Sequence, residues 1–376
     1  MIYKNRFYFF LSFFLFLIVG CTAEKQHSFS ITGSVSNLKE NFVLLSVIDD
    51  LQNNTSTVID TLKVNELGEF KADYFLEPNI YSLTFDGIKT INLAIDKGQD
   101  IFLKGTSLDH LTITGSVDTD LLNAYETIRK ESLDRLVNSV RNEIKTLQSD
   151  NANEDKIAEL RELEVENYDK HLHELMIFVK DKMGISLAVY PTSIRWIGGE
   201  YLPFLKELVG NFEKKYPASK ITENLKSKIQ LLEKTSVGGV ISGIEMPDSN
   251  NETISLNSIQ KKYTLIDFWA SWCPPCRTES KLLNNLYSAY NAKGFEIYGI
   301  SLDSKRENWL NAIEKDKRIW TEVSTVEGFK TAVSIEYGIT SLPTNFLIDS
   351  SGKIVAVNIH GRALKEKIDA LFRNSP

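Results

Sequence analysis

The segment most informative about this 376-residue chain reads Asp267-Phe-Trp-Ala-Ser-Trp-Cys-Pro-Pro-Cys-Arg277. It places Cys273 and Cys276 where two sequence patterns meet. The apolar run Tyr263–Trp269 predicts a buried parallel strand, and the amphipathic run Thr278–Ala289 predicts a helix. We therefore expect a strand that leads through a short turn into a helix, with the cysteines at the start of that helix.

This position makes a reactive thiol. The first turn of a helix has unpaired backbone N–H groups and the positive end of the helix dipole, and both stabilise a thiolate over a thiol. Cys273 is therefore the expected nucleophile. Cys276, one turn into the helix, is placed to attack the mixed disulfide that Cys273 forms with a partner. The pair can then cycle between dithiol and disulfide.

From about Gly243 to the C-terminus, further matches accompany the two cysteines: Asp267-Phe-Trp, Trp272-Cys-Pro-Pro-Cys-Arg, Glu279, Tyr298-Gly-Ile-Ser-Leu-Asp303, Tyr337-Gly338, and Leu342-Pro-Thr before Phe346-Leu-Ile-Asp349. In this order they resemble the thioredoxin superfamily, and in particular the membrane-tethered thiol-disulfide oxidoreductases of bacterial envelopes related to TlpA and ResA. The resemblance implies an α/β thioredoxin-like fold and a protein-disulfide oxidoreductase. Its redox group would be the Cys273–Cys276 disulfide, without a further cofactor.

The resemblance also implies two catalytic carboxylates. Asp267, six residues before Cys273, falls where thioredoxins have a buried carboxylate. Desolvation would raise its pKa, so that it could accept the proton of Cys276. The alternative is a polar residue at a strand end. Glu279 matches a glutamate that tunes the pair or contacts substrate, although an acidic residue in the first helical turn is also favoured by the helix dipole alone.

Contact with a client protein is expected opposite the cysteines. Pro343 aligns with the cis-proline of the superfamily, where the backbone of Leu342 and Thr344 would be offered to a client strand; an isolated proline would more often be trans. Trp272 would form part of the apolar docking surface, or simply pack. The predicted client-contacting residues are Trp272, Pro274, Pro275, Leu342, Pro343 and Thr344.

The chain departs from the family at two places. Lys281 stands where the family usually has a proline that kinks the helix, so we expect a straighter helix beside Cys276. Pro274-Pro275 replaces the Gly-Pro of thioredoxin. Residues between the cysteines shift their potential over a range from about −270 mV to about −120 mV.

The N-terminus has the layout of an export signal. Lys4 and Arg6 precede the apolar run Phe7–Val19, without an acidic residue. Leu17-Ile-Val-Gly-Cys21 resembles a bacterial lipobox, which implies a signal peptide over residues 1–20 and a lipid on Cys21. An ordinary signal peptide or an uncleaved anchor is the alternative. The lipid would hold the protein in the cell envelope, facing the periplasm.

Composition excludes other classes of function. With 42% apolar residues, 25% charged residues and a formal charge of −7, the chain is globular and lacks the basic surface that nucleic acid requires. Besides Cys21, the only cysteines are Cys273 and Cys276, so a framework of structural disulfides is not expected. No metal site is predicted, because the five histidines are scattered. His171 and His173 are expected on the surface.

The chain is long enough for several domains. Short alternating strands predict an all-β, sandwich-like domain over residues 28–117, and resemble the β-rich domain, of unknown role, that often precedes thioredoxin-like domains in such lipoproteins. Helical periodicity predicts a second domain over residues 118–236, with a turn at Ser149–Asn153 and later helices at Ile185–Tyr190, Tyr201–Lys215 and Ile221–Lys234. The thioredoxin-like domain would occupy residues 240–376.

These observations favour a lipid-anchored enzyme that reduces disulfides of exported proteins, with electrons from a membrane donor, since the envelope holds no thiol buffer of its own. One alternative is a binding lipoprotein in which the cysteines only sense redox state. Another is a thiol peroxidase with antioxidant activity, because Gly243–Pro247 and Gly299–Asp303 also resemble peroxiredoxin-like sequences. Peroxidases usually lack a CxxC partner, which ranks this alternative lower.

Overall fold

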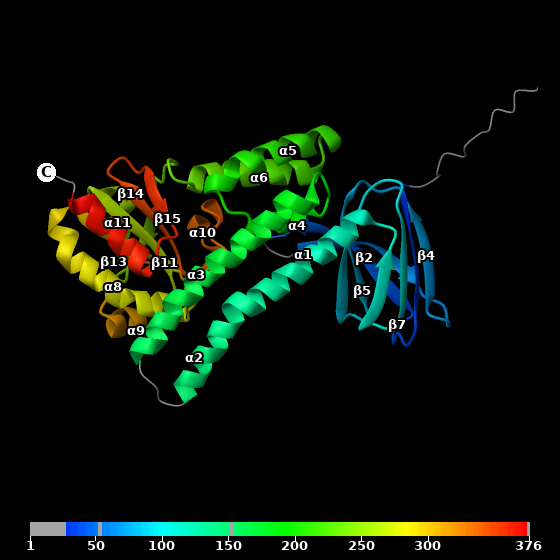
Figure 1. The fold of residues 1–376 in the computed structure, drawn as a ribbon, viewed down its shortest axis with the longest axis horizontal. Helices are drawn as coiled ribbons and strands as arrows, with labels where there is room; N and C mark the ends of the chain where they lie inside the picture. The colour runs from blue at the N-terminus through cyan, green and yellow to red at the C-terminus, as the bar shows by residue number, and fades with distance from the viewer. Residues whose placement is uncertain (1–27, 52–54, 150–153, 374–376) are drawn as a thin grey trace, which may run out of the picture.

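The computed structural model describes residues 28–51, 55–149 and 154–373. The predicted signal peptide and Cys21 lie outside these ranges. Strands occupy one end of the molecule, the C-terminal sheet lies at the other end, and helices connect the two (Figure 1). The predicted fold class, an all-β region followed by a helical and then an α/β region, is confirmed. The predicted domain boundaries stay predictions.

The described part of the β-rich region contains two four-stranded sheets, ordered β4-β1-β7-β8 and β3-β2-β5-β6. Alternation along the strands turns apolar side chains such as Ile31, Leu45 and Leu103 into one core, where they are almost fully buried. The strands are β1 (Phe29–Val35), β2 (Phe42–Asp50), β3 (Thr55–Lys63), β4 (Glu69–Tyr74), β5 (Asn79–Phe85), β6 (Lys89–Ile95), β7 (Asp100–Ser107) and β8 (His110–Thr114).

The helical region begins at Ser116, whose side chain caps the first helix by accepting from the Thr119 N–H. Helix α1 packs against α3 and helix α5 against α6, and α3 also packs against α2. The elements are α1 (Val117–Leu133), the π-helix Asp134–Asn138, α2 (Ser139–Ser149), α3 (Glu154–Phe178), the π-helix Val179–Met183, α4 (Val189–Thr192), the 3₁₀ turns Ser193–Arg195 and Gly199–Tyr201, α5 (Leu202–Lys215) and α6 (Lys220–Thr235).

Two predictions for this region are wrong. The expected helix Ile185–Tyr190 is absent, because α4 begins only at Val189. The preceding segment bonds to a buried carboxylate instead: Asp118 Oδ1 accepts from the Ser186 hydroxyl at 2.6 Å and from the Leu187 N–H at 3.0 Å. His171 is 2% exposed rather than on the surface. The turn predicted at Ser149–Asn153 lies mostly outside the described residues.

His171 is buried because α3 packs against α1 along this face. Its Nδ1 lies 3.0 Å from Ser132 Oγ, and burial lowers the pKa of His171, helped by nearby arginines. His171 is therefore a neutral hydrogen-bonding residue between two helices. Periodicity alone could not indicate that a second helix covers it.

The described C-terminal residues form a five-stranded sheet of order β13-β12-β11-β14-β15, with a separate β9–β10 pair. The central strand β11 is parallel to β12 and antiparallel to β14. The elements are β9 (Glu245–Pro247), β10 (Thr253–Ser255), α7 (Leu256–Ile259), β11 (Tyr263–Trp269), α8 (Pro274–Tyr290), the 3₁₀ turn Asn291–Lys293, β12 (Phe295–Ser301), α9 (Arg306–Asp316), β13 (Thr321–Val323), the 3₁₀ turn Gly328–Lys330, α10 (Ala332–Glu336), β14 (Thr344–Asp349), β15 (Ile354–Val357) and α11 (Gly361–Arg373).

Strand β11 positions the cysteines. Leu265, Ile266 and Phe268 are completely buried, with Leu265 in one apolar cluster and the other two in a second. A strand covered on both faces reads as a continuous apolar run, as predicted. The edge strand β13 was not predicted, because its three residues Thr-Glu-Val carry no strand signal of their own.

Across the described ranges, every helix is too short or too polar to cross a bilayer.

Candidate redox-active site

The two cysteines form a disulfide at the end of β11 and the start of α8. The sulfur atoms are 2.03 Å apart and the Cα atoms 5.4 Å apart. Cys273 occupies the N-cap position, with prolines in the first turn, and the backbone N–H of Cys276 lies 3.3 Å from its sulfur. Proline costs nothing in a first turn because that N–H has no helical partner. The predicted position of Cys273 at a helix start is confirmed.

The exposed surface beside the pair is apolar. Cys273 and Cys276 are only 4% and 3% exposed, whereas Trp272 is 54% exposed. The ring of Trp272 lies 6.1 Å from that of Phe329, between centroids. An exposed aromatic side chain next to a nearly covered sulfur can contact a partner that presents its own disulfide.

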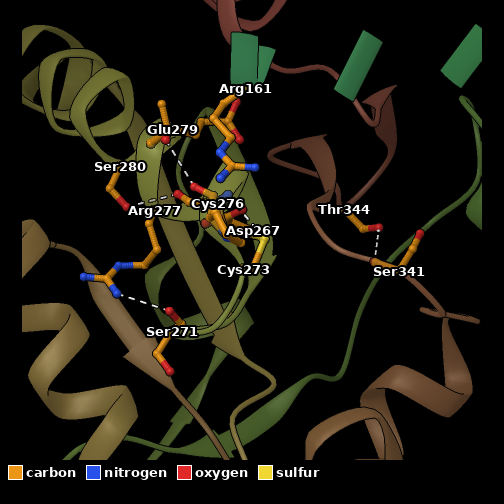
Figure 2. The surroundings of a disulfide bond; sticks show 12 residues. Arg161, Asp267, Ser271, Cys273, Cys276, Arg277, Glu279, Ser280, Ser341 and Thr344 are labelled. Carbon is orange, nitrogen blue, oxygen red and sulfur yellow. Dashed lines mark hydrogen bonds between the residues drawn. A yellow bond between two sulfur atoms is a disulfide. The ribbon is translucent and has the colours of Figure 1, made fainter. Parts of the chain in front are cut away.

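The turn before Cys273 is fixed by charged side chains. Ser271 donates through its backbone N–H and its hydroxyl to the Asp303 carboxylate, at 2.9 and 2.5 Å. Arg277 donates to the Ser271 carbonyl at 3.2 Å (Figure 2) and pairs with Asp316 on α9. Two neighbouring elements therefore hold the loop that presents Cys273.

Asp267 lies beneath the cysteines in a buried ionic network. Its Oδ2 accepts from Arg318 Nη2 at 2.6 Å, while Arg318 Nε donates to Glu322 at 2.5 Å. Burial raises the pKa of Asp267, although the Arg318 guanidinium opposes this effect. The Arg318 guanidinium also stacks over the Trp269 ring at 3.8 Å.

The network continues to the helix that carries Cys276. Arg318 Nη1 donates to Ser280 Oγ at 2.9 Å. The Ser280 hydroxyl in turn donates to the Cys276 carbonyl at 3.3 Å, as Figure 2 shows. Asp267 is thus linked through Arg318 and Ser280 to the turn of Cys276. Sequence reasoning missed Arg318, since an arginine four residues before a glutamate outside a predicted helix carries no distinctive signal.

Glu279 bridges α8 to the start of α11. Its carboxylate lies 3.0 Å from His360 Nδ1 and accepts from the Gly361 N–H at 3.0 Å. Burial by itself would lower the pKa of His360, but the Glu279 carboxylate outweighs it, and the pKa of His360 is raised overall. His360 was not predicted at the site, because it lies 81 residues from its partner.

The loop opposite the disulfide begins β14. The Leu342–Pro343 peptide bond is cis, as expected from the resemblance. Thr344 Oγ1 donates to the Ser341 carbonyl at 2.8 Å, and Figure 2 shows both residues on the loop across from the disulfide. Leu342 packs against the cluster that contains Cys273. The structure therefore brings this loop, Trp272 and the cysteines together.

The helical region also reaches the site, which the sequence did not indicate. Helix α3 packs against α8. A small cavity of about 40 Å³ separates α3 residues Arg161, Glu162 and Val165 from a set of residues on the redox side: Pro275, Thr278, Glu279, Leu282, Pro343, His360 and Gly361. The predicted client-contacting residues Pro275 and Pro343 thus face a second wall made by α3.

No group of three or more histidine, cysteine, aspartate or glutamate side chains in the described part of the chain is arranged to hold a metal ion. The site described above combines sulfur and acid–base groups. They provide a reversible disulfide, a buried carboxylate and a histidine–glutamate pair.

Comparisons with known proteins agree with this geometry. Residues 237–357 match the AhpC/TSA family, and residues 29–122 match a domain of unknown function, DUF4369. The chain is 31% identical over 152 residues to the thiol-disulfide oxidoreductase ResA of Bacillus thuringiensis (strain Al Hakam), covering 38% of this chain and 79% of the relative. ResA of Geobacillus thermodenitrificans (strain NG80-2) is 31% identical over 138 residues, covering 36% and 77%.

Solved structures match the same region. The C-terminal domain of a putative thiol-disulfide oxidoreductase from Bacteroides thetaiotaomicron is 32% identical, with a TM-score of 0.36 and coverage of 38% of this chain and 99% of that domain. A solution structure of a thiol:disulfide interchange protein from Bacteroides sp. is 35% identical, with a TM-score of 0.35 and coverage of 38% and 93%. From the sequence relatives and the Cys-Pro-Pro-Cys pair on its thioredoxin-like domain, we conclude that the chain belongs to the ResA-type thiol-disulfide oxidoreductases.

Proposed function

We propose that this oxidoreductase reduces disulfides of exported proteins. The observation that carries the proposal is the position of Cys273 at the N-terminus of α8, beside exposed Trp272 and opposite the loop of Pro343. The helix terminus favours the thiolate that attacks a disulfide. The apolar surface and the loop backbone suit an extended client segment better than a small solute.

The reaction would proceed in two exchanges. The Cys273 thiolate attacks one client sulfur, and the other client sulfur leaves as a thiolate that takes a proton from water. Cys276 then loses its proton and attacks the Cys273 sulfur, which breaks the mixed disulfide and releases the second client thiolate. The client gains two electrons, and the Cys273–Cys276 pair loses two and becomes the disulfide seen here.

Asp267 is the proposed acceptor of the Cys276 proton. Its burial and raised pKa suit a general base, and Arg318 and Ser280 connect it to the turn of Cys276. Glu279, held by His360, is proposed to position the helix face next to the client. Trp272, Pro274, Pro275, Leu342, Pro343 and Thr344 are the proposed client contacts.

The proposed setting is the cell envelope. The export-signal pattern and the lipobox-like Leu17–Cys21 support a lipid on Cys21 and an orientation toward the periplasm. A membrane electron donor would return the pair to the dithiol, because a disulfide must be reduced again after each turnover. Incorporation of labelled palmitate and membrane fractionation test the anchor: Cys21→Ser should abolish both the label and the membrane association.

The oxidoreductase assay uses insulin with intact disulfides as the client, and measures the insulin thiols that appear when the reduced protein is added. Cys273→Ser should abolish release. Cys276→Ser should instead accumulate a mixed disulfide between Cys273 and insulin, visible on a non-reducing gel, because the resolving thiol is missing. Release by Cys273→Ser at the wild-type rate would contradict the proposal.

A thiol peroxidase is the second candidate, favoured by the AhpC/TSA match over residues 237–357. A peroxidase should consume hydrogen peroxide when a thiol is supplied to reduce it again, and the Cys276→Ser variant should keep this activity. Peroxide consumption no faster than with a free thiol would remove this candidate.

A further inference from the structure

A larger cavity lies beside the redox site, between the helical region and the thioredoxin-like sheet. Its volume is about 700 Å³, within the range of binding pockets in general. Helix α3, the segment 194–201 and helix α6 line one side, and the loop 337–341 lines the other. That loop leads directly into Pro343, so the cavity opens next to the proposed docking loop. Ser341 and Thr344, which lie on the loop across from the disulfide in Figure 2, belong to its lining.

One face of α3 connects the redox site to this cavity. Arg161, Glu162 and Val165 line the small cavity at Pro343, and Tyr168 and Leu172 line the large one. These positions recur at spacings of three and four, so they lie along a single face of the helix. A client segment that runs from the loop of Pro343 toward the C-terminal end of α3 therefore meets the large cavity.

The cavity holds a cation without an ion-pair partner. Lys228 of α6 lines it, and no carboxylate in the described residues lies within salt-bridge distance of this lysine. The acidic lining groups are otherwise engaged: Asp169 Oδ2 and Glu200 Oε1 lie 3.5 and 3.7 Å from the two ring nitrogens of His173.

Burial lowers the pKa of Lys228 to about 8, so the ammonium form still predominates at neutral pH. A cation that has lost part of its hydration without gaining a carboxylate attracts an anion more strongly than a solvated surface lysine does. Of the other charged groups in the lining, Arg195 lies beside the hydroxyl of buried Tyr125. Lys228 is therefore the group that an incoming carboxylate would satisfy.

We propose that this cavity receives an acidic side chain of the client, with Lys228 as the recognising cation, while the client disulfide lies against Cys273. The proposal rests on the reductase function proposed above and deepens it by naming the client class, namely disulfide proteins with Asp or Glu near the target cysteine. The aromatic side chain of Tyr168 in the lining would cover the apolar part of the same client segment.

The test uses the full chain, reduced and freed of excess thiol, with three disulfide probes. Two are cyclic peptides of identical sequence except that residues near one cysteine are aspartates in one and lysines in the other; the third is the small neutral compound 4,4′-dithiodipyridine. Stopped-flow single-turnover rates are measured against probe concentration, which separates apparent binding from the exchange step.

Wild-type protein should bind the aspartate peptide about tenfold more tightly than the lysine peptide. Lys228→Gln should abolish that preference, Lys228→Glu should reverse it, and neither should change the rate with 4,4′-dithiodipyridine. Lys226→Gln is the matched control, because Lys226 lies on the same helix, pairs with Glu213 and is not part of the cavity lining. It should leave the preference intact.

Equal binding of the two peptides, or a preference that survives Lys228→Gln, would overturn the inference while leaving the oxidoreductase in place. Failure to react with all three probes would instead reject the proposed reductase itself.

Discussion

Replacing Arg318 with methionine is expected to destabilise the thioredoxin-like domain severely. The Arg318 side chain is 0% exposed and lies between the carboxylates of Asp267 and Glu322, which are 4% and 5% exposed. Its removal leaves two buried carboxylates without a cation between them. Breaking a buried ion pair in this way costs about 3–5 kcal/mol of unfolding free energy. Methionine fills much of the same volume, so most of the loss would be electrostatic.

Urea unfolding followed by tryptophan fluorescence measures this loss. The Trp269 and Trp320 rings lie 3.8 and 4.8 Å from the guanidinium carbon, so the signal reports on the same region. Arg362→Met is the control: that side chain is 86% exposed and pairs with Glu366 on the surface of α11, and its loss should not be measurable.

A second substitution separates charge from packing. Asp267→Asn in the Arg318→Met background removes one of the two unpaired carboxylates and should recover part of the lost stability. The reasoning would be refuted if Arg318→Met unfolded at the same urea concentration as Arg362→Met, or if Asp267→Asn made the Arg318→Met protein less stable still.

Three further predictions concern other parts of the same domain. Burial lowers the pKa of His360, but the Glu279 carboxylate raises it overall. The His360–Glu279 pair therefore stabilises the fold fully below about pH 6.5 and less as the pH rises through the folded pKa of His360. In thermal unfolding, the wild-type midpoint should fall more steeply over this pH range than that of His360→Asn. Trp272→Ala should leave thermal stability unchanged, because the ring is 54% exposed. It should lower the rate of reduction of disulfide-bonded insulin about tenfold and leave the rate with 4,4′-dithiodipyridine unchanged. Equal losses of rate with both substrates would argue against a docking role. Gly299→Ala places a Cβ 2.4 Å from a buried carboxylate oxygen and should cost about 1–3 kcal/mol in urea unfolding, whereas Gly210→Ala, with open space around it, should not destabilise.

Local patterns predicted the strands and the cysteine position well. The run Tyr263–Trp269 is apolar apart from Thr264 and Asp267, which is the pattern expected of a strand that is covered on both faces. Cys273 lies at a helix start because prolines and a helical run follow it directly. Both features depend on residues that are neighbours in the chain.

Features that depend on distant partners could not be predicted in this way. Arg318 meets Asp267 across 51 residues, and His360 meets Glu279 across 81. The packing of α3 against α8 joins two regions that the sequence presents as separate domains. The proposed role of Lys228 likewise depends on the helical region lying beside the loop 337–341. A single sequence gives the chemistry of each side chain, but not which charge neutralises which.

The reduction potential of the Cys273–Cys276 pair tests the central claim most directly. The protein without its first 21 residues would be equilibrated in thiol buffers of known potential, and the fraction of disulfide measured by alkylation. A reductase of exported proteins predicts a potential near or below about −220 mV. A value above about −180 mV would mark an oxidant or isomerase and contradict the account.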